Sequence, residues 1–182
     1  MSLTALSEVT KVLKIAQLRK VDICKEDNGI SDMQSFVVIQ NGDVFECFQS
    51  GVDAHPFESL PYVLNNAYNE GVKMFDTISV VVDSYFAGKL VDEVNDYKRG
   101  DLSEQFKNDP NTKVRECLSV MTYGWSGDKA GKVITYAYND KGLPEFTLVP
   151  EAEGGVMSSE FVDFVMNSYI EFCKKNPDGE AQ

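Results

Sequence analysis

Apolar and polar positions alternate most regularly in residues 77–83, Thr-Ile-Ser-Val-Val-Val-Asp. Ile78, Val80 and Val82 occupy every second position, so an extended chain places them on one face. β-Branched residues also fit a pleated, half-buried surface. The stretch predicts a central sheet strand, covered on its apolar face by the C-terminal helix.

Three other segments repeat their apolar residues at intervals of three and four, which is typical of amphipathic helices. They are residues 4–20, 59–71 and 158–175, with Ser59 and Ser158 as N-caps and Gly71 as the stop of the middle helix. In the last segment the expected inward stripe is Val162, Val165, Tyr169 and Phe172, widened by Phe161, Met166 and Cys173. Residues 21–34 lack a period and predict a loop.

The remaining strands are predicted from alternation and from turn residues. Residues 35–40 and 43–49 flank Asn41-Gly42, which favours a type I′ hairpin. Residues 114–123, 132–139 and 145–149 predict a three-strand meander. Between the central strand and this meander, residues 87–113 form a polar excursion with at least one short helix near residues 89–96.

Together these elements predict a single α+β domain over residues 1–182, with residues 177–182 as a loose tail. Its mostly antiparallel sheet has about six strands, formed by the hairpin, the central strand and the meander. The N-terminal, middle and C-terminal helices pack on this sheet, and we expect them on one face.

Composition places the chain among ordinary globular proteins, with 43% hydrophobic and 25% charged residues. It has no apolar run of the ~20 residues that a spanning helix needs, and no secretory leader. We therefore expect a cytoplasmic protein that does not enter membranes. The four cysteines form no C-x-x-C pair, which favours reduced thiols over a metal ribbon.

The net charge of −12 is unevenly distributed. Residues 1–20 carry four bases and one acid, a net +3, so the remainder of the chain carries −15. Such a surface repels phosphate backbones, and direct nucleic-acid binding is not expected. One alternative function follows from the same charge: an acidic mimic or inhibitor of a basic partner.

Standard catalytic and cofactor motifs do not fit. Gly124-Trp125-Ser126-Gly127 lacks the spacing of a nucleophile elbow. The glycines before Lys132 precede a strand rather than the helix of a phosphate loop. We therefore predict no cofactor and no metal, and we favour a non-enzymatic protein.

Acid-base chemistry by carboxylates is the catalytic alternative. Asp83 ends the central strand and Glu116 lies among apolar neighbours, so pairing of their strands brings them together in a cleft. His55, the single histidine, is a third candidate because its charge changes near neutral pH. The alternative is that none of the three is catalytic: Asp83 and Glu116 are equally edge or rim residues, and His55 is an ordinary loop residue.

Three residues are candidates for binding: Trp125, Tyr85 and Arg115. Trp125 lies at a loop mouth, and tryptophan is enriched at the energetic centres of interfaces. Core packing is the alternative role of a single tryptophan. Arg115 is equally a counter-ion for the neighbouring carboxylates.

Residues 76–142 resemble a group of small phage and bacterial proteins of unknown function. The likeness lies in residues 80–86, in the Asp-Pro turn leading into residues 109–118, and in the turn at residues 139–142. Tyr85 stands where that group's pattern has a tryptophan. The resemblance implies a microbial or viral origin and nothing about mechanism.

The favoured function is thus an interaction or accessory domain that binds a protein partner or associates with itself through an exposed sheet surface. A small-molecule binder or enzyme using Asp83 and Glu116 stays open as an alternative, and the sequence does not identify its ligand.

Overall fold

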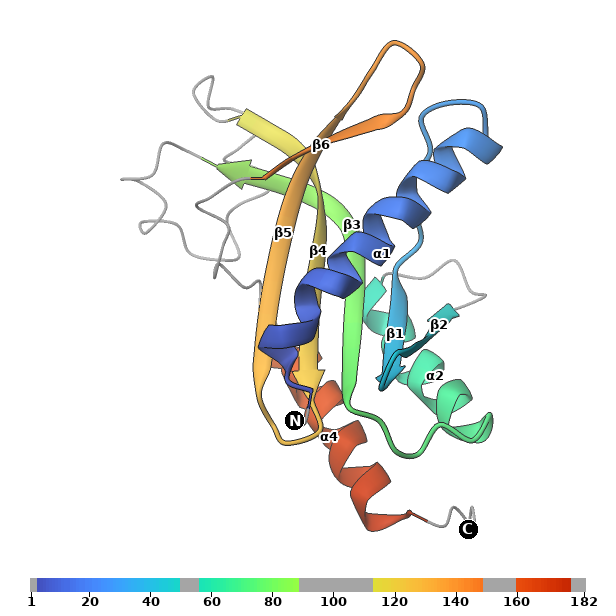
Figure 1. The fold of residues 1–182 in the computed structure, drawn as a ribbon, viewed down its shortest axis with the longest axis vertical. Helices are drawn as coiled ribbons and strands as arrows, with labels where there is room; N and C mark the ends of the chain where they lie inside the picture. The colour runs from blue at the N-terminus through green and yellow to red at the C-terminus, as the bar shows by residue number, and fades with distance from the viewer. Residues whose placement is uncertain (1–2, 50–55, 89–112, 149–159, 178–182) are drawn as a thin grey trace.

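The computed structural model describes residues 3–49, 56–88, 113–148 and 160–177 (Figure 1). Within them lie three helices and six strands. In chain order they are α1 (Ala5–Glu26), β1 (Phe36–Asn41), β2 (Val44–Gln49), α2 (Pro56–Asn69), β3 (Thr77–Gly88), β4 (Lys113–Gly124), β5 (Lys129–Tyr138), β6 (Pro144–Leu148) and α4 (Glu160–Lys175). The predicted α+β class with N-terminal, middle and C-terminal helices is confirmed.

The strands form one antiparallel sheet in the order β2-β1-β3-β4-β5-β6. Strand β3 lies inside it, paired with β1 on one side and with β4 on the other. The pairing with β4 extends from Thr77 opposite Gly124 to Gly88 opposite Lys113. The predicted hairpin, central strand and meander are therefore neighbours in one sheet.

Helices cover both faces of this sheet, so the expectation that they share one face is wrong. Helix α1 crosses β3, β4 and β5 on one side, while α2 and α4 pack on the other (Figure 1). The reason is that β3 is apolar on both faces: Val80 joins the core beneath α2 and α4, and Val81 joins the core beneath α1. Burial of apolar surface stabilises the fold by about 25 cal/mol per Å², and an apolar face left in water would not contribute this stabilisation.

The apolar face of residues 77–83 lies where the sequence places it. Ile78 is 0% exposed and shares a core with Met166 of α4, which is also 0% exposed. The predicted contact between the central strand and the C-terminal helix is confirmed.

Helix α1 is longer than predicted. Thr4 caps its start, with its side chain accepting from the Ser7 amide in a capping box. The helix then continues through residues 21–26, which the sequence had suggested to be loop, and ends before Asn28 (φ 57°). Its buried stripe continues past Ala16 to Lys20 and Cys24, so the helical period persists through a charged residue.

The hairpin turn differs from the predicted type I′. Asn41 pairs with Val44, which leaves Gly42 and Asp43 as the two central residues. Type I′ needs positive φ at both, yet of the two only Gly42 has it (φ 57°). Glycine at the first central position is the pattern of a type II′ turn.

Helices α2 and α4 also differ in detail. Helix α2 begins at Pro56, so Ser59 lies inside it instead of capping it.

In α4 the buried residues are Val162, Met166, Tyr169, Ile170 and Cys173. Contrary to prediction, Phe161 and Phe172 do not lie in the core: they are 49% and 48% exposed, and Phe164 is 70% exposed. We call Phe161, Phe164 and Phe172 the phenylalanine stripe. The predicted helix near residues 89–96 and the Ser158 cap fall outside the described residues.

Candidate functional site

Asp83 lies on β3 beneath α1, and its side chain is 7% exposed. From the described residues its carboxylate accepts three hydrogen bonds. Lys20 Nζ and the Met33 amide donate to Oδ2 at 2.7 and 3.0 Å, and the Tyr136 hydroxyl donates to Oδ1 at 2.6 Å. The carboxylate of Asp83 in β3 therefore connects this strand to α1, to β5 and to the segment that precedes β1.

Lys20 is the charge partner, and its side chain is fully buried. Besides Asp83, its ammonium donates to the Ser31 carbonyl at 2.5 Å and lies 5.1 and 5.5 Å from the rings of Tyr136 and Tyr138. Burial alone lowers the pKa of a lysine, but the hydrogen bond and charge of Asp83 outweigh burial and raise the pKa of Lys20. Lys20 therefore stays charged at neutral pH.

Tyr136 is held as a hydrogen-bond donor. Burial raises the pKa of its hydroxyl, and the hydrogen bond to Asp83 raises it further. Both oxygens of Asp83 are engaged and little of its side chain is exposed, so Asp83 is poorly placed to accept a proton from a substrate. The geometry suits a buried ion pair that attaches α1 to the sheet.

Glu116 lies on the same face of the sheet. It lies directly opposite Tyr136 of β5, and it is two positions from Leu118 of β4, which lies opposite Asp83. Burial raises the pKa of Glu116; Lys20 opposes this rise, and the negative charges of Asp83 and Asp32 add to it. The structure thus brings the two predicted carboxylates to one face, and Asp83 has Lys20 as a counter-ion.

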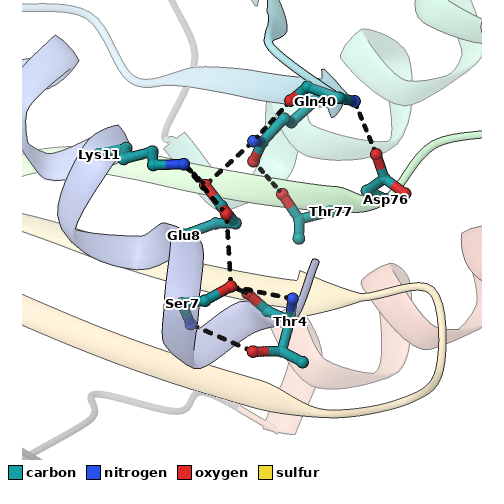
Figure 2. Close-up of polar contacts among 8 residues, drawn as sticks. Thr4, Ser7, Glu8, Lys11, Gln40, Asp76 and Thr77 are labelled. Atoms are coloured by element: carbon teal, nitrogen blue, oxygen red, sulfur yellow. Dashed lines mark hydrogen bonds and ion pairs between the residues drawn. The ribbon is translucent and has the colours of Figure 1, made fainter. Parts of the chain in front are cut away.

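A second buried polar cluster lies under the first turns of α1 (Figure 2). Glu8, 1% exposed, accepts from Gln40 Nε2 at 3.0 Å and pairs with Lys11 at 2.9 Å. Gln40 in turn accepts from the Thr77 hydroxyl at 2.9 Å. Burial opposes ionisation of Glu8, but the bonds from Lys11 and Gln40 prevail, and its pKa is lowered. These contacts attach the start of α1 to β1 and β3.

Trp125 packs at the end of the sheet. It is partly buried, its ring makes an edge contact with Phe75 (centroids 5.0 Å apart), and Lys174 Nζ lies 5.6 Å from its centroid. Its binding role stays a prediction. Tyr85 and Arg115 lie in β3 and β4, but their side chains are outside the described residues, as is the whole of His55.

The described ranges contain no group of three or more His, Cys, Asp or Glu side chains placed to hold a metal. No helix in these ranges is long and apolar enough to cross a bilayer. All four cysteines are free thiols; Cys24, Cys117 and Cys173 are buried and Cys47 is exposed.

Lys20, Glu8, Tyr136 and Gln40 were not predicted as site residues. A signal for two of them existed. Glu8 and Lys20 fall on the apolar stripe of α1, in step with Val12 and Ala16, and a charge on such a stripe indicates a buried partner. The partner itself was not predictable, because Asp83 is 63 residues from Lys20.

Comparison with protein-family models found no match, and neither curated proteins nor solved structures gave one. The resemblance of residues 76–142 to phage and bacterial proteins therefore stays a prediction.

Proposed function

We propose that this chain is a non-enzymatic interaction domain whose binding surface is the phenylalanine stripe of α4. The observation that carries the proposal is the exposure of Phe164, 70%, between Phe161 and Phe172 at 49% and 48%. Single scattered exposed apolar residues are normal, but three exposed phenylalanines on one helix of 16 residues depart from that pattern. Large aromatic side chains are also the residues that contribute most to protein interfaces.

The state of the carboxylates supports the same proposal. Asp83, one of the three catalytic candidates, is committed to Lys20, Tyr136 and the Met33 amide. An ion pair with this burial is typical of structural contacts between elements. The predicted acid-base pair of Asp83 and Glu116 therefore lacks a free carboxylate at position 83.

Photo-crosslinking tests the proposal directly. Phe164 is replaced by p-benzoylphenylalanine in the full chain, and cells producing it are irradiated. Tyr62 of α2, 71% exposed and outside the stripe, is the matched control position. We expect protein adducts from position 164 and few from position 62. Equal or absent adducts at both positions contradict the proposal.

A thermal-shift panel of metabolites, metals and nucleotides tests the small-molecule alternative. A ligand at 100 times its Kd adds about 2.7 kcal/mol to the stability of the protein, which is easily detected. A hit abolished by Glu116→Gln would favour the carboxylate site over the interaction domain. The expected cytoplasmic location and lack of nucleic-acid binding stay predictions.

A further inference from the structure

We propose that the partner of the phenylalanine stripe is a second copy of this chain, with α4 packed antiparallel against the partner's α4 about a twofold axis at Ser168. The inference rests on the proposed function and specifies its partner. It follows from the spacing, the charges and the exposure of the residues on the outer side of α4.

The spacing is self-complementary. Positions 161, 164, 168 and 172 follow one another at intervals of three, four and four, so they lie along one exposed side of the helix. Phe172 lies at the edge of this side, where its ring also packs against Tyr68 of α2 with centroids 5.0 Å apart. Ser168 is small and exposed, which allows two helix backbones to approach closely. Phe164 and Phe172 are each four residues from Ser168. An antiparallel pair centred there therefore packs Phe164 on the partner's Phe172, twice.

The charges select the antiparallel orientation. The first turn of α4 is acidic, with Glu160 and Asp163, and the last turn is basic, with Lys174 and Lys175. Antiparallel packing places Glu160 beside the partner's Lys175, whereas parallel packing places like charges together. Asp163 is already paired with Lys129 at 3.1 Å, so Glu160 is the first-turn acid that we assign to the partner.

The exposed area is suited to the centre of an interface. At about 200 Å² for each phenylalanine, the stripe exposes roughly 300 Å² per copy. A stable interface buries about 800 Å² per partner, so the stripe supplies an apolar centre and the polar residues around it supply the rim. Asn167 and Glu171 are exposed and lie in position for that rim.

Sedimentation of the full chain over a range of concentrations tests the pairing. We expect a species of twice 20.3 kDa that dissociates on dilution. Phe164→Asp should shift the midpoint concentration at least tenfold upward, and the control Tyr62→Asp should leave it unchanged. Circular dichroism checks that both variants are folded, as expected for side chains that are mostly exposed.

Charge reversal tests the orientation. Glu160→Lys and Lys175→Glu should each weaken the dimer several-fold, and the double variant should restore it. In a Cys47→Ser background, which removes the exposed native thiol, Ser168→Cys should form a disulfide-linked dimer under mild oxidation. The control Asn69→Cys, on an exposed position of α2, should not.

A chain that stays monomeric at every concentration overturns the inference, as does a dimer insensitive to Phe164→Asp. These results are distinguishable from failure of the proposed function. A photo-adduct from position 164 with a different protein keeps the interaction domain and rejects the second copy as its partner. No adduct from position 164 rejects both.

Discussion

Removal of either member of the Lys20–Asp83 pair should cost far more stability than removal of both. Lys20→Met leaves a carboxylate that is 7% exposed and has Tyr136 and the Met33 amide as its donors among the described residues. Asp83→Asn leaves a fully buried ammonium whose other hydrogen-bond partners, the Ser31 carbonyl and the Tyr138 hydroxyl, carry no charge. Breaking a buried pair by removing one partner typically costs about 3–5 kcal/mol.

The double variant Lys20→Met/Asp83→Asn removes both charges at once. The amide side chain introduced at position 83 keeps an oxygen that accepts from Tyr136, and the methionine introduced at position 20 fills most of the lysine volume. Replacement of a buried ion pair by uncharged groups is often close to neutral, so the double variant should recover most of the loss. The interaction energy of the cycle should be at least about 2 kcal/mol.

Urea unfolding followed by far-UV circular dichroism measures each free energy of unfolding. For a chain of 182 residues, 3–5 kcal/mol corresponds to a fall in Tm of roughly 6–20 °C. If the two single losses simply add in the double variant, Lys20 and Asp83 do not act as a pair. The account of how α1 is held on the sheet would then be refuted.

Three further predictions concern other parts of the molecule. Glu116→Gln should raise stability at pH 7 by about 0.5 kcal/mol. Because the pKa of Glu116 is raised in the folded protein, the wild type loses stability as the pH rises above about 4.3, and the uncharged glutamine does not. Identical pH profiles for wild type and variant contradict this. Glu8→Gln acts in the opposite sense, because its pKa is lowered: it should cost about 2 kcal/mol at pH 7, and the cost should shrink as the pH falls below about 4. Gly142→Ala should cost about 2–4 kcal/mol, because residue 142 has a φ of 73° and the added Cβ would lie 2.7 Å from Gly29 Cα. Gly127→Ala should cost about 1 kcal/mol, because residue 127 has a φ of 95° but open space around the added Cβ. Equal Tm values for these two glycine variants would show that the close approach does not matter.

Local patterns predicted the elements better than their packing. Alternation around Ile78 and Val80 placed the central strand correctly, since a period of two reports directly on an extended chain. The same strand carries Val81 toward the other face, and its helical cover there was missed. The outer side of α4 was misassigned for a related reason: a helix that is apolar on more than one side does not reveal which side faces the core.

The site was predictable only in part. That Asp83 and Glu116 share a face follows from strand pairing, and the sequence supported it. The predicted helix ends too early, at residue 20, because residues 21–34 lack an apolar period, whereas α1 continues to Glu26 beyond the buried Lys20. A buried lysine is rare, and its presence depends on a carboxylate brought from a distant strand by the fold.

The two buried charges of α1 have a consequence for how accurately this helix is positioned. Glu8 and Lys20 are separated by about 18 Å along the axis. Between them the inner surface is aliphatic, and contacts of that kind are non-directional and tolerate sliding. A slip of one turn, about 5.4 Å, would separate Glu8 from Gln40 and Lys20 from Asp83 in the same movement. Polar contacts at both ends thus select a single longitudinal register for a helix whose middle would accept several.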